Sequence, residues 1–323
     1  MQNSSTFLEK YANDADQQAR FFASAREAGR RHAGLTDINE IRAELDAMRS
    51  PSFADMLPAF HRLLASESLC RYFQDEVDCS LASDIHQAQG QAIDNEAMQG
   101  LQMIDGEHFS VAVVVSDPTS IADKKRRNLD RPTSVMMTPK DLLVRFIRAG
   151  GARISLYSCD AIDDAAPAER GLRCSRGRVV EVKDGDTLVL RAGRDSFSVE
   201  SAASVVCFAQ AYAKHSDVSV MPEFDSKSLE LIGLSATNDK ASRIQMMTTI
   251  LRVFGHERAF DVALPFVAHQ DYFVRWYVMR ELLAIDAGRA WPLVEAMAIN
   301  DPHPHVRETA TRTLALLAPA IAA

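Results

Sequence analysis

The sequence predicts an α+β protein in which two helical regions flank a small antiparallel β-barrel or sandwich. Apolar residues recur at helical spacing over the first hundred residues, short apolar runs separated by turn residues fill the middle, and helical spacing returns after about Lys240. We therefore expect a helical region over 1–104, a β-rich domain over 105–222 and a helical array over 223–323. A chain of 323 residues is long enough for two or three such domains.

The amino-terminal region is expected to contain three to five helices. Thr6-Phe7-Leu8-Glu9 has the pattern of a capping box, and it predicts a helix from there to about Arg31. Apolar residues at helical spacing predict helices over about 38–48 and 53–64, and a shorter one over about 69–77.

The β-rich domain begins with the apolar run Phe109 to Val115, which predicts a buried strand. Thr138-Pro139 predicts a helix start, with the threonine as cap and proline in the first turn, and Gly150-Gly151 predicts its end. Arg153 to Cys159 predicts another strand. Strand, helix and strand could form a parallel crossover unit, or the helix could pack outside a barrel.

The centre of this domain is the stretch 178–212. Asp184-Gly185 lies between two β-branched runs and predicts a hairpin, because a tight turn needs residues that tolerate positive φ. Alternation after Gly193, over 196–199, and an apolar run over 205–212 predict two further strands.

Part of this stretch resembles the second motif of the cupin family. Gly185 and Gly193 lie in register with the two glycines of the motif. Arg191 stands where cupins usually have proline, Ser196 where they have a metal-binding histidine, and Glu200 where they often have asparagine. The first cupin motif, with two histidines and a glutamate, is not visible upstream. The resemblance implies a cupin-like barrel without its metal, so no cofactor is expected.

Two segments of the carboxy-terminal region place an aspartate shortly before Val-Arg. Asp271 precedes Val274-Arg275 and Asp301 precedes Val306-Arg307, with a period of 32 residues between the Val-Arg pairs. Each segment follows an apolar helix and opens another. The pattern resembles HEAT repeats, whose second helix commonly begins with these residue types. The resemblance implies an α-solenoid, which needs a neighbour because such repeats cannot bury their faces alone.

Two groups of residues are candidates for binding. The candidate ligand-binding residues are polar groups on otherwise apolar strands, as in many pockets: Arg153, Tyr157, Arg191 and Ser196. The candidate partner-binding residues are the repeat arginines and the one concentrated basic run: Arg275, Arg307, Lys124, Lys125, Arg126 and Arg127. The alternatives are that the repeat arginines and aspartates stabilise helix ends, and that the basic run is a solvated loop.

Metal and catalytic motifs are sparse. His269, His303 and His305 have spacings found in metal sites, but they fall in helix–helix turns, where exposed histidines are usual. The β region offers only His108 and His215 toward a two-histidine, one-carboxylate iron site. The chain contains no P-loop, no GxGxxG after a strand and no GxSxG elbow, so the commonest nucleotide-binding and hydrolase classes are excluded. No catalytic residue is assigned.

The net charge and the cysteine content limit which partners and which cellular compartment we expect. A net charge of −8 gives no general attraction to nucleic acid or anionic membranes. Five cysteines without a CxxC pair, no signal peptide and no long apolar run predict a cytoplasmic protein.

The first hypothesis from these observations is a non-enzymatic interaction or regulatory protein that binds a protein partner through its carboxy-terminal repeats. The second is a sensor or metal-dependent enzyme that binds a small molecule in the β domain. A helper subunit of another enzyme would combine the two, and the sequence does not separate it from the first.

Overall fold

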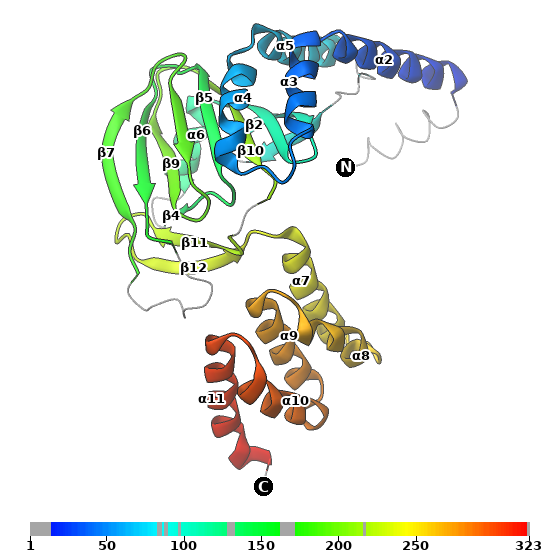
Figure 1. The fold of residues 1–323 in the computed structure, drawn as a ribbon, viewed down its shortest axis with the longest axis vertical. Coiled ribbons are helices and arrows are strands. Elements are labelled where there is room, and N and C mark those ends of the chain that lie inside the picture. The colour runs from blue at the N-terminus through cyan, green and yellow to red at the C-terminus, as the bar shows by residue number, and fades with distance from the viewer. Residues whose placement is uncertain are drawn as a thin grey trace. The chain divides into compact units, whose positions relative to one another are not determined.

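The structure is a computed structural model that describes residues 14–82, 86, 90–95, 98–127, 133–161, 172–215 and 218–321. The chain divides into two compact units that exchange segments along the sequence (Figure 1). Unit 1 comprises residues 1–133, 140–158 and 176–216, and unit 2 comprises residues 134–139, 159–175 and 217–323.

Unit 1 combines helices with most of the strands. Its helices are α2 (Ala15–Ala33), α3 (Thr36–Asp46), α4 (Phe53–Ala65), α5 (Glu67–Ala82) and α6 (Pro118–Arg127). Its strands are β1 (Gln91–Asn95), β2 (Met98–Asp105), β3 (Phe109–Ser116), β5 (Leu142–Arg148), β6 (Arg153–Ser158), β7 (Ser175–Glu181), β8 (Thr187–Leu190), β9 (Asp195–Ser201) and β10 (Val206–Ala213).

The strands of unit 1 form two sheets. The larger has the order β1-β2-β3-β10-β5-β8, and all of its neighbours are antiparallel. The smaller has the order β7-β6-β9. The described strands therefore form separate sheets rather than one closed barrel.

Alternation along the strands gives unit 1 two apolar cores. Phe109 and Val111 of β3 face the helices, where they pack with residues such as Phe60 of α4. Ala112 and Val114 face the small sheet instead. Helices α3 to α5 thus cover one face of the large sheet, and the small sheet covers the other (Figure 1).

Several predicted elements of unit 1 are confirmed. The helices over 38–48, 53–64 and 69–77 correspond to α3, α4 and α5, and the strands over 109–115 and 196–199 correspond to β3 and β9. The predicted capping box Thr6-Phe7-Leu8-Glu9 lies outside the described residues. Within them, α2 begins at Ala15, where the Asp14 carboxylate accepts two backbone N–H groups at 3.0 Å.

Three predictions for unit 1 are wrong. The helix expected after Thr138 is strand β5, and the parallel crossover is absent from the described strands because β5 pairs antiparallel with both β10 and β8. The helical region expected to reach residue 104 ends earlier, since β1 and β2 are strands. Asp184-Gly185 does form a turn, with φ of +89° at Gly185, but no hairpin. The strand before it joins the small sheet and the strand after it joins the large one.

Unit 2 contains a three-stranded sheet and a set of consecutive helices. Its strands are β4 (Ser134–Met136), β11 (Val220–Asp225) and β12 (Leu231–Ala236), in the order β12-β11-β4. Its helices are α7 (Asp239–Val253), α8 (Ala259–Ala263), the 3-10 helix η1 (Leu264–Ala268), α9 (Tyr272–Ile285), α10 (Ala287–Asn300) and α11 (Pro304–Ile321). The predicted boundary at residue 222 falls inside β11.

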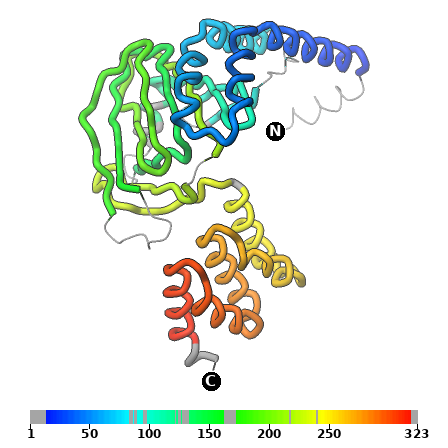
Figure 2. The backbone as a smooth tube through the Cα atoms, viewed as in Figure 1, coloured from blue at the N-terminus to red at the C-terminus, as the bar shows by residue number. Residues whose placement is uncertain are grey.

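The helices of unit 2 pack each against its neighbours in the chain, as the backbone trace shows (Figure 2). One core joins Ala241 of α7 and Phe260 of α8 to Val274 and Val278 of α9. A second joins α9, α10 and α11 around Met279 and neighbouring residues. The predicted apolar helices of this region are thereby confirmed. None of the helices described is both long and apolar enough to cross a bilayer.

Candidate functional site

The space between the two sheets of unit 1 is filled by side chains. Phe146, Phe197 and Phe208 come from three different strands, and their ring centroids lie 6.0 to 6.3 Å apart. Phe146 and Phe208 are almost fully buried, and aliphatic residues of both sheets surround them. These described side chains form a packed core of the kind that stabilises a fold.

Three of the four predicted ligand-binding residues lie on the opposite face of the small sheet. Tyr157 and Ser196 are directly paired across β6 and β9, and Arg153 shares the face of Tyr157 because it lies four residues before it on the same strand. The intervening Ile154 and the adjacent Phe197 point into the core. These polar groups therefore lie outside the core between the two sheets, although Tyr157 and Ser196 are buried and only Arg153 is exposed.

The fourth residue, Arg191, is held in the turn before β9. Its Nε and Nη2 atoms donate to the two carboxylate oxygens of Asp195 at 2.7 and 2.9 Å. Burial alone would raise the pKa of Asp195, but the hydrogen bonds and the charge of Arg191 outweigh it and lower that pKa. Arg191 thus stabilises the turn that contains Gly193, where φ is +67°.

A second polar group on the outer face of the small sheet was missed in the sequence. Arg176 of β7 donates to Ser155 Oγ at 3.1 and 3.2 Å and to Glu200 Oε1 at 2.8 Å, and its guanidinium lies 5.8 Å from the ring centre of Tyr157. These contacts join all three strands. They are long-range, so no local spacing could reveal them.

The basic run expected in a loop is the last turn of α6. The Asp117 carboxylate accepts the Ser120 N–H at 3.1 Å at the start of this helix. Of the four side chains, that of Arg126 is described, and it is exposed and paired with Asp123. Basic residues at a helix end are favoured by the helix dipole, which gives the run a structural reason in addition to any partner.

The two repeat arginines have equivalent hydrogen bonds. Arg275 Nη1 donates to the carbonyls of His269 and Gln270 at 2.9 Å, and Arg307 Nη1 donates to those of Asp301 and Pro302 at 2.6 and 3.0 Å. The acceptors are 32 residues apart, like the arginines themselves. Each arginine therefore closes the turn that precedes its helix.

Arg275 also forms a buried ion pair. Its Nε and Nη2 atoms donate to the two carboxylate oxygens of Asp301 at 2.8 and 2.7 Å, and both side chains are less than a tenth exposed. Burial would raise the pKa of Asp301, but the Arg275 hydrogen bonds, the His303 backbone N–H and the Arg275 charge lower it. The pair links the start of α9 to the turn before α11.

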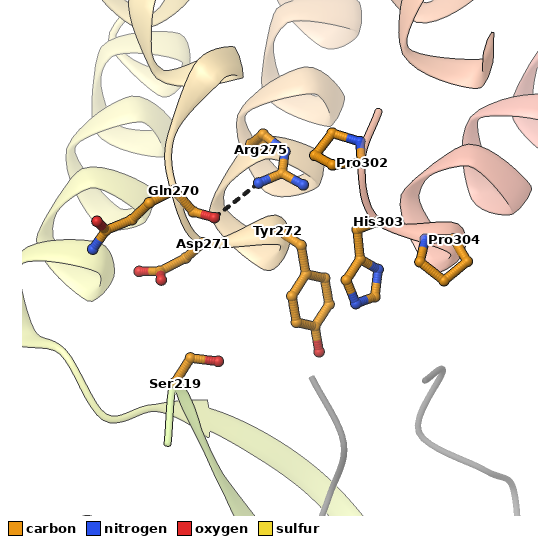
Figure 3. A pocket seen from close by; sticks show the side chains of 8 residues that line it. All are labelled: Ser219, Gln270, Asp271, Tyr272, Arg275, Pro302, His303 and Pro304. Atoms are coloured by element: carbon orange, nitrogen blue, oxygen red, sulfur yellow. Dashed lines mark hydrogen bonds between the residues drawn. The ribbon is translucent and has the colours of Figure 1, made fainter. Parts of the chain in front are cut away.

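A cavity of about 340 Å³ opens beside these turns (Figure 3). Its lining residues are Ser219, Gln270, Asp271, Tyr272, Arg275, Pro302, His303 and Pro304. The rings of Tyr272 and His303 are stacked, with centroids 3.8 Å apart and planes at 5°. The cavity therefore offers an aromatic wall next to a carboxylate, and sequence spacing alone suggested only metal-like histidines here.

The histidines of these turns accept backbone hydrogen bonds. His269 Nδ1 accepts the Asp271 N–H at 3.0 Å, and His303 Nδ1 accepts the His305 N–H at 3.2 Å. Among the residues that the structure describes, no group of three or more His, Cys, Asp or Glu side chains is placed to hold a metal ion.

Within the described part of unit 2, α7 and its C-cap residue Phe254 carry a group of exposed apolar side chains. We define the α7 stripe as five residues that are 37 to 81% exposed: Met246, Met247, Ile250, Val253 and Phe254. Met246, Ile250 and Val253 are separated by steps of four and three residues, and Met247, Ile250 and Phe254 by steps of three and four, so the five residues lie on one side of the helix. The sequence analysis did not single out this face, because the sequence alone does not show which side of a helix is buried.

No family model matches the sequence, and no curated protein matches it. Solved structures similar to part of it include an RmlC-like cupin from Shewanella frigidimarina, 7% identical with a TM-score of 0.25 over 40% of this chain and 87% of that one. The structure of KdgF from Halomonas sp. is 11% identical, with a TM-score of 0.25 over 39% of this chain and 88% of that one. A cupin domain from Bordetella pertussis is 11% identical, with a TM-score of 0.23 over 38% and 99%. TM-scores of this size carry no argument about ligand, partner or activity.

Proposed function

We propose that the chain is a non-enzymatic protein-interaction protein, in which a cupin-like β unit is a scaffold and a HEAT-like helical array binds a protein partner. The observation that carries the proposal is the α7 stripe. Contiguous apolar surface of this kind is uncommon on monomeric proteins and is typical of interaction sites. Two of its five residues are methionines, whose flexible side chains adapt to different partners.

The packing of both units supports this proposal. The packed core between the two sheets of unit 1 favours a stabilising role for these sheets over a role as a ligand pocket. In the helical unit, the turns closed by Arg275 and Arg307 repeat at the period of the sequence pattern, as expected of stacked repeats. The first helix of such a stack keeps one face without a neighbouring repeat, and α7 occupies that position.

The test compares the full-length protein with two substitutions to arginine. Ile250→Arg introduces a charge into the α7 stripe, whereas Ile299→Arg is a matched change at a residue of α10 that is 75% exposed and lies outside the stripe. We expect quantitative cross-linking in lysate to show partners that are lost with Ile250→Arg and retained with Ile299→Arg. Identical partner profiles for all three proteins would overturn the proposal.

The cavity beside Tyr272 and His303 favours a second candidate function, a small-molecule sensor or a helper subunit of another enzyme. A stacked aromatic wall and a nearby carboxylate suit a planar cationic ligand. A thermal-shift screen of planar organic cations tests this candidate. A hit that stabilises the wild type but not Asp271→Asn would support it, and the absence of any stabilising compound would leave the interaction function alone.

A further inference from the structure

The inner face of α7 is already used within the helical array. Ala241 and Ile244 pack in the core with α9. The Thr249 and Tyr277 hydroxyls lie 2.6 Å apart, and Arg252 pairs with a Glu of α9, Glu281. The α7 stripe therefore points away from α9, and its occupant must come from outside the array.

The α7 stripe is symmetric along the helix. Measured from Ile250, apolar residues lie at three and four positions on both sides: Met246 and Met247 before it, Val253 and Phe254 after it. An antiparallel pair of α7 helices with a two-fold axis at Ile250 would set Met246 against Phe254 and Met247 against Val253 of the other copy. Such a self-complementary surface is what an isologous two-fold interface requires.

The charges at the two ends of the stripe are complementary in the same arrangement. Arg243 lies in α7 seven positions before Ile250, and Glu257 lies seven positions after it in the turn that follows the helix, next to Arg258; all three are exposed. An antiparallel pair brings Arg243 of one copy toward Glu257 and the α7 carboxy-terminal carbonyls of the other, where a cation is favoured. A parallel pair would instead place the two Arg243 side chains together. The charges thus select the antiparallel orientation.

We propose that the α7 stripe binds the α7 stripe of a second copy of this chain, with the helices antiparallel about Ile250. The inference rests on the proposed interaction function and names its partner. A single helix pair buries less than the roughly 1,200 Å² of a standard stable interface, so the dimer belongs to the weak, reversible class. It should form and dissociate with protein concentration.

Sedimentation velocity on the full-length protein over roughly a hundredfold range of concentration tests the proposal. We expect the wild type to pass from monomer to dimer. Ile250→Arg places two like charges on the two-fold axis and should weaken the dimer by roughly 100-fold or more. The matched change Ile299→Arg should leave the dimer unchanged. Circular dichroism confirms that each variant is folded, which is expected because both positions are exposed.

A charge exchange tests the orientation. Arg243→Glu and Glu257→Arg should each weaken the dimer, and the double variant should restore it, because the exchanged charges again face each other. Failure of the double variant to restore a dimer that depends on Ile250 would overturn the antiparallel arrangement.

Two outcomes separate this inference from the proposed function. If the wild type stays monomeric and Ile250→Arg still removes other proteins from the cross-linked set, self-pairing is wrong and the interaction function stands. If Ile250→Arg changes neither self-association nor capture of other proteins, both fail.

Discussion

Replacing Asp301 with alanine should severely destabilise unit 2. The substitution removes both carboxylate oxygens that pair with Arg275, a residue only 6% exposed. Its guanidinium keeps the carbonyls of His269 and Gln270 as acceptors. Removing one partner of a buried ion pair commonly costs about 3–5 kcal/mol, because the other charge stays buried without compensation. The lost acceptor for the His303 N–H adds to this cost.

The chain provides a selective assay for this change. Its two tryptophans, Trp276 and Trp291, both lie in helices of unit 2, so tryptophan fluorescence during urea unfolding reports on unit 2 alone. With a slope of about 2 kcal/mol per molar urea, a loss of 3–5 kcal/mol lowers the midpoint by roughly 2 M. The control is Asp261→Ala, which removes an exposed ion pair with Arg289 and should cost about 1 kcal/mol or less.

The pH dependence of the Asp301→Ala effect has a definite sign. The pKa of Asp301 in the folded protein lies below its ordinary 3.8, so the carboxylate contributes its full stability above that value and loses it as pH falls through the folded pKa. The stability difference between wild type and Asp301→Ala should therefore be constant near neutral pH and shrink below about pH 4. A midpoint shift no larger than that of Asp261→Ala, or one unchanged in acid, would refute the reasoning.

Three further predictions concern unit 1, and circular dichroism during urea unfolding measures each of them. Phe146→Ala should cost about 3–5 kcal/mol, because it opens a cavity in the packed interior, and a cost near zero would contradict a filled core. Tyr72→Phe should be neutral or slightly stabilising, since the buried hydroxyl has no hydrogen-bond partner among the described residues. In the wild type, burial raises the pKa of the Tyr72 phenol to about 12, so the ultraviolet absorbance of this side chain should not titrate below about pH 11. Gly150→Ala should cost more than about 1–2 kcal/mol, because φ is +61° and the new Cβ would lie 2.6 Å from two carbonyl oxygens. Gly255→Ala, with φ of +60° and open space, is its control and should cost less.

Helices were predictable from the sequence because their information is local. Met56, Phe60 and Leu64 show the buried side of α4 directly, and Ser52 with Asp55 forms the capping box that begins it. The continuous apolar run of β3 identified a strand for the same reason. Each of these elements carries its own pattern, whatever it later packs against.

Strands in the middle of the chain were harder to predict because their partners are distant. Thr138-Pro139 is a good local helix start, yet Val144 and Phe146 are buried in a sheet whose other members lie on both sides of the sequence. The turn at Gly185 was predictable, but the strands before and after it belong to different sheets. Long-range pairing thus overrode correct local signals.

The candidate sites also include features that local sequence patterns predict and features that depend on long-range packing. The spacing of the α7 stripe and of the repeat arginines could be read from the sequence. The filling of the interior by Phe146, Phe197 and Phe208 could not, because it depends on three strands meeting. The packing of these three rings between the sheets also places Tyr157 and Ser196 on the opposite face of the small sheet.

The place of β4 in unit 2 has a consequence for how the protein is made. β4 hydrogen-bonds to β11, but it leaves the ribosome long before β11 does, with most of the sandwich strands of unit 1 synthesised between them. The sheet of unit 2 therefore closes late and across a long loop, which slows its formation. A fragment that begins at β11 would lack this neighbour and expose a free strand edge, a template for aggregation. The helical unit is thus best produced within the whole chain.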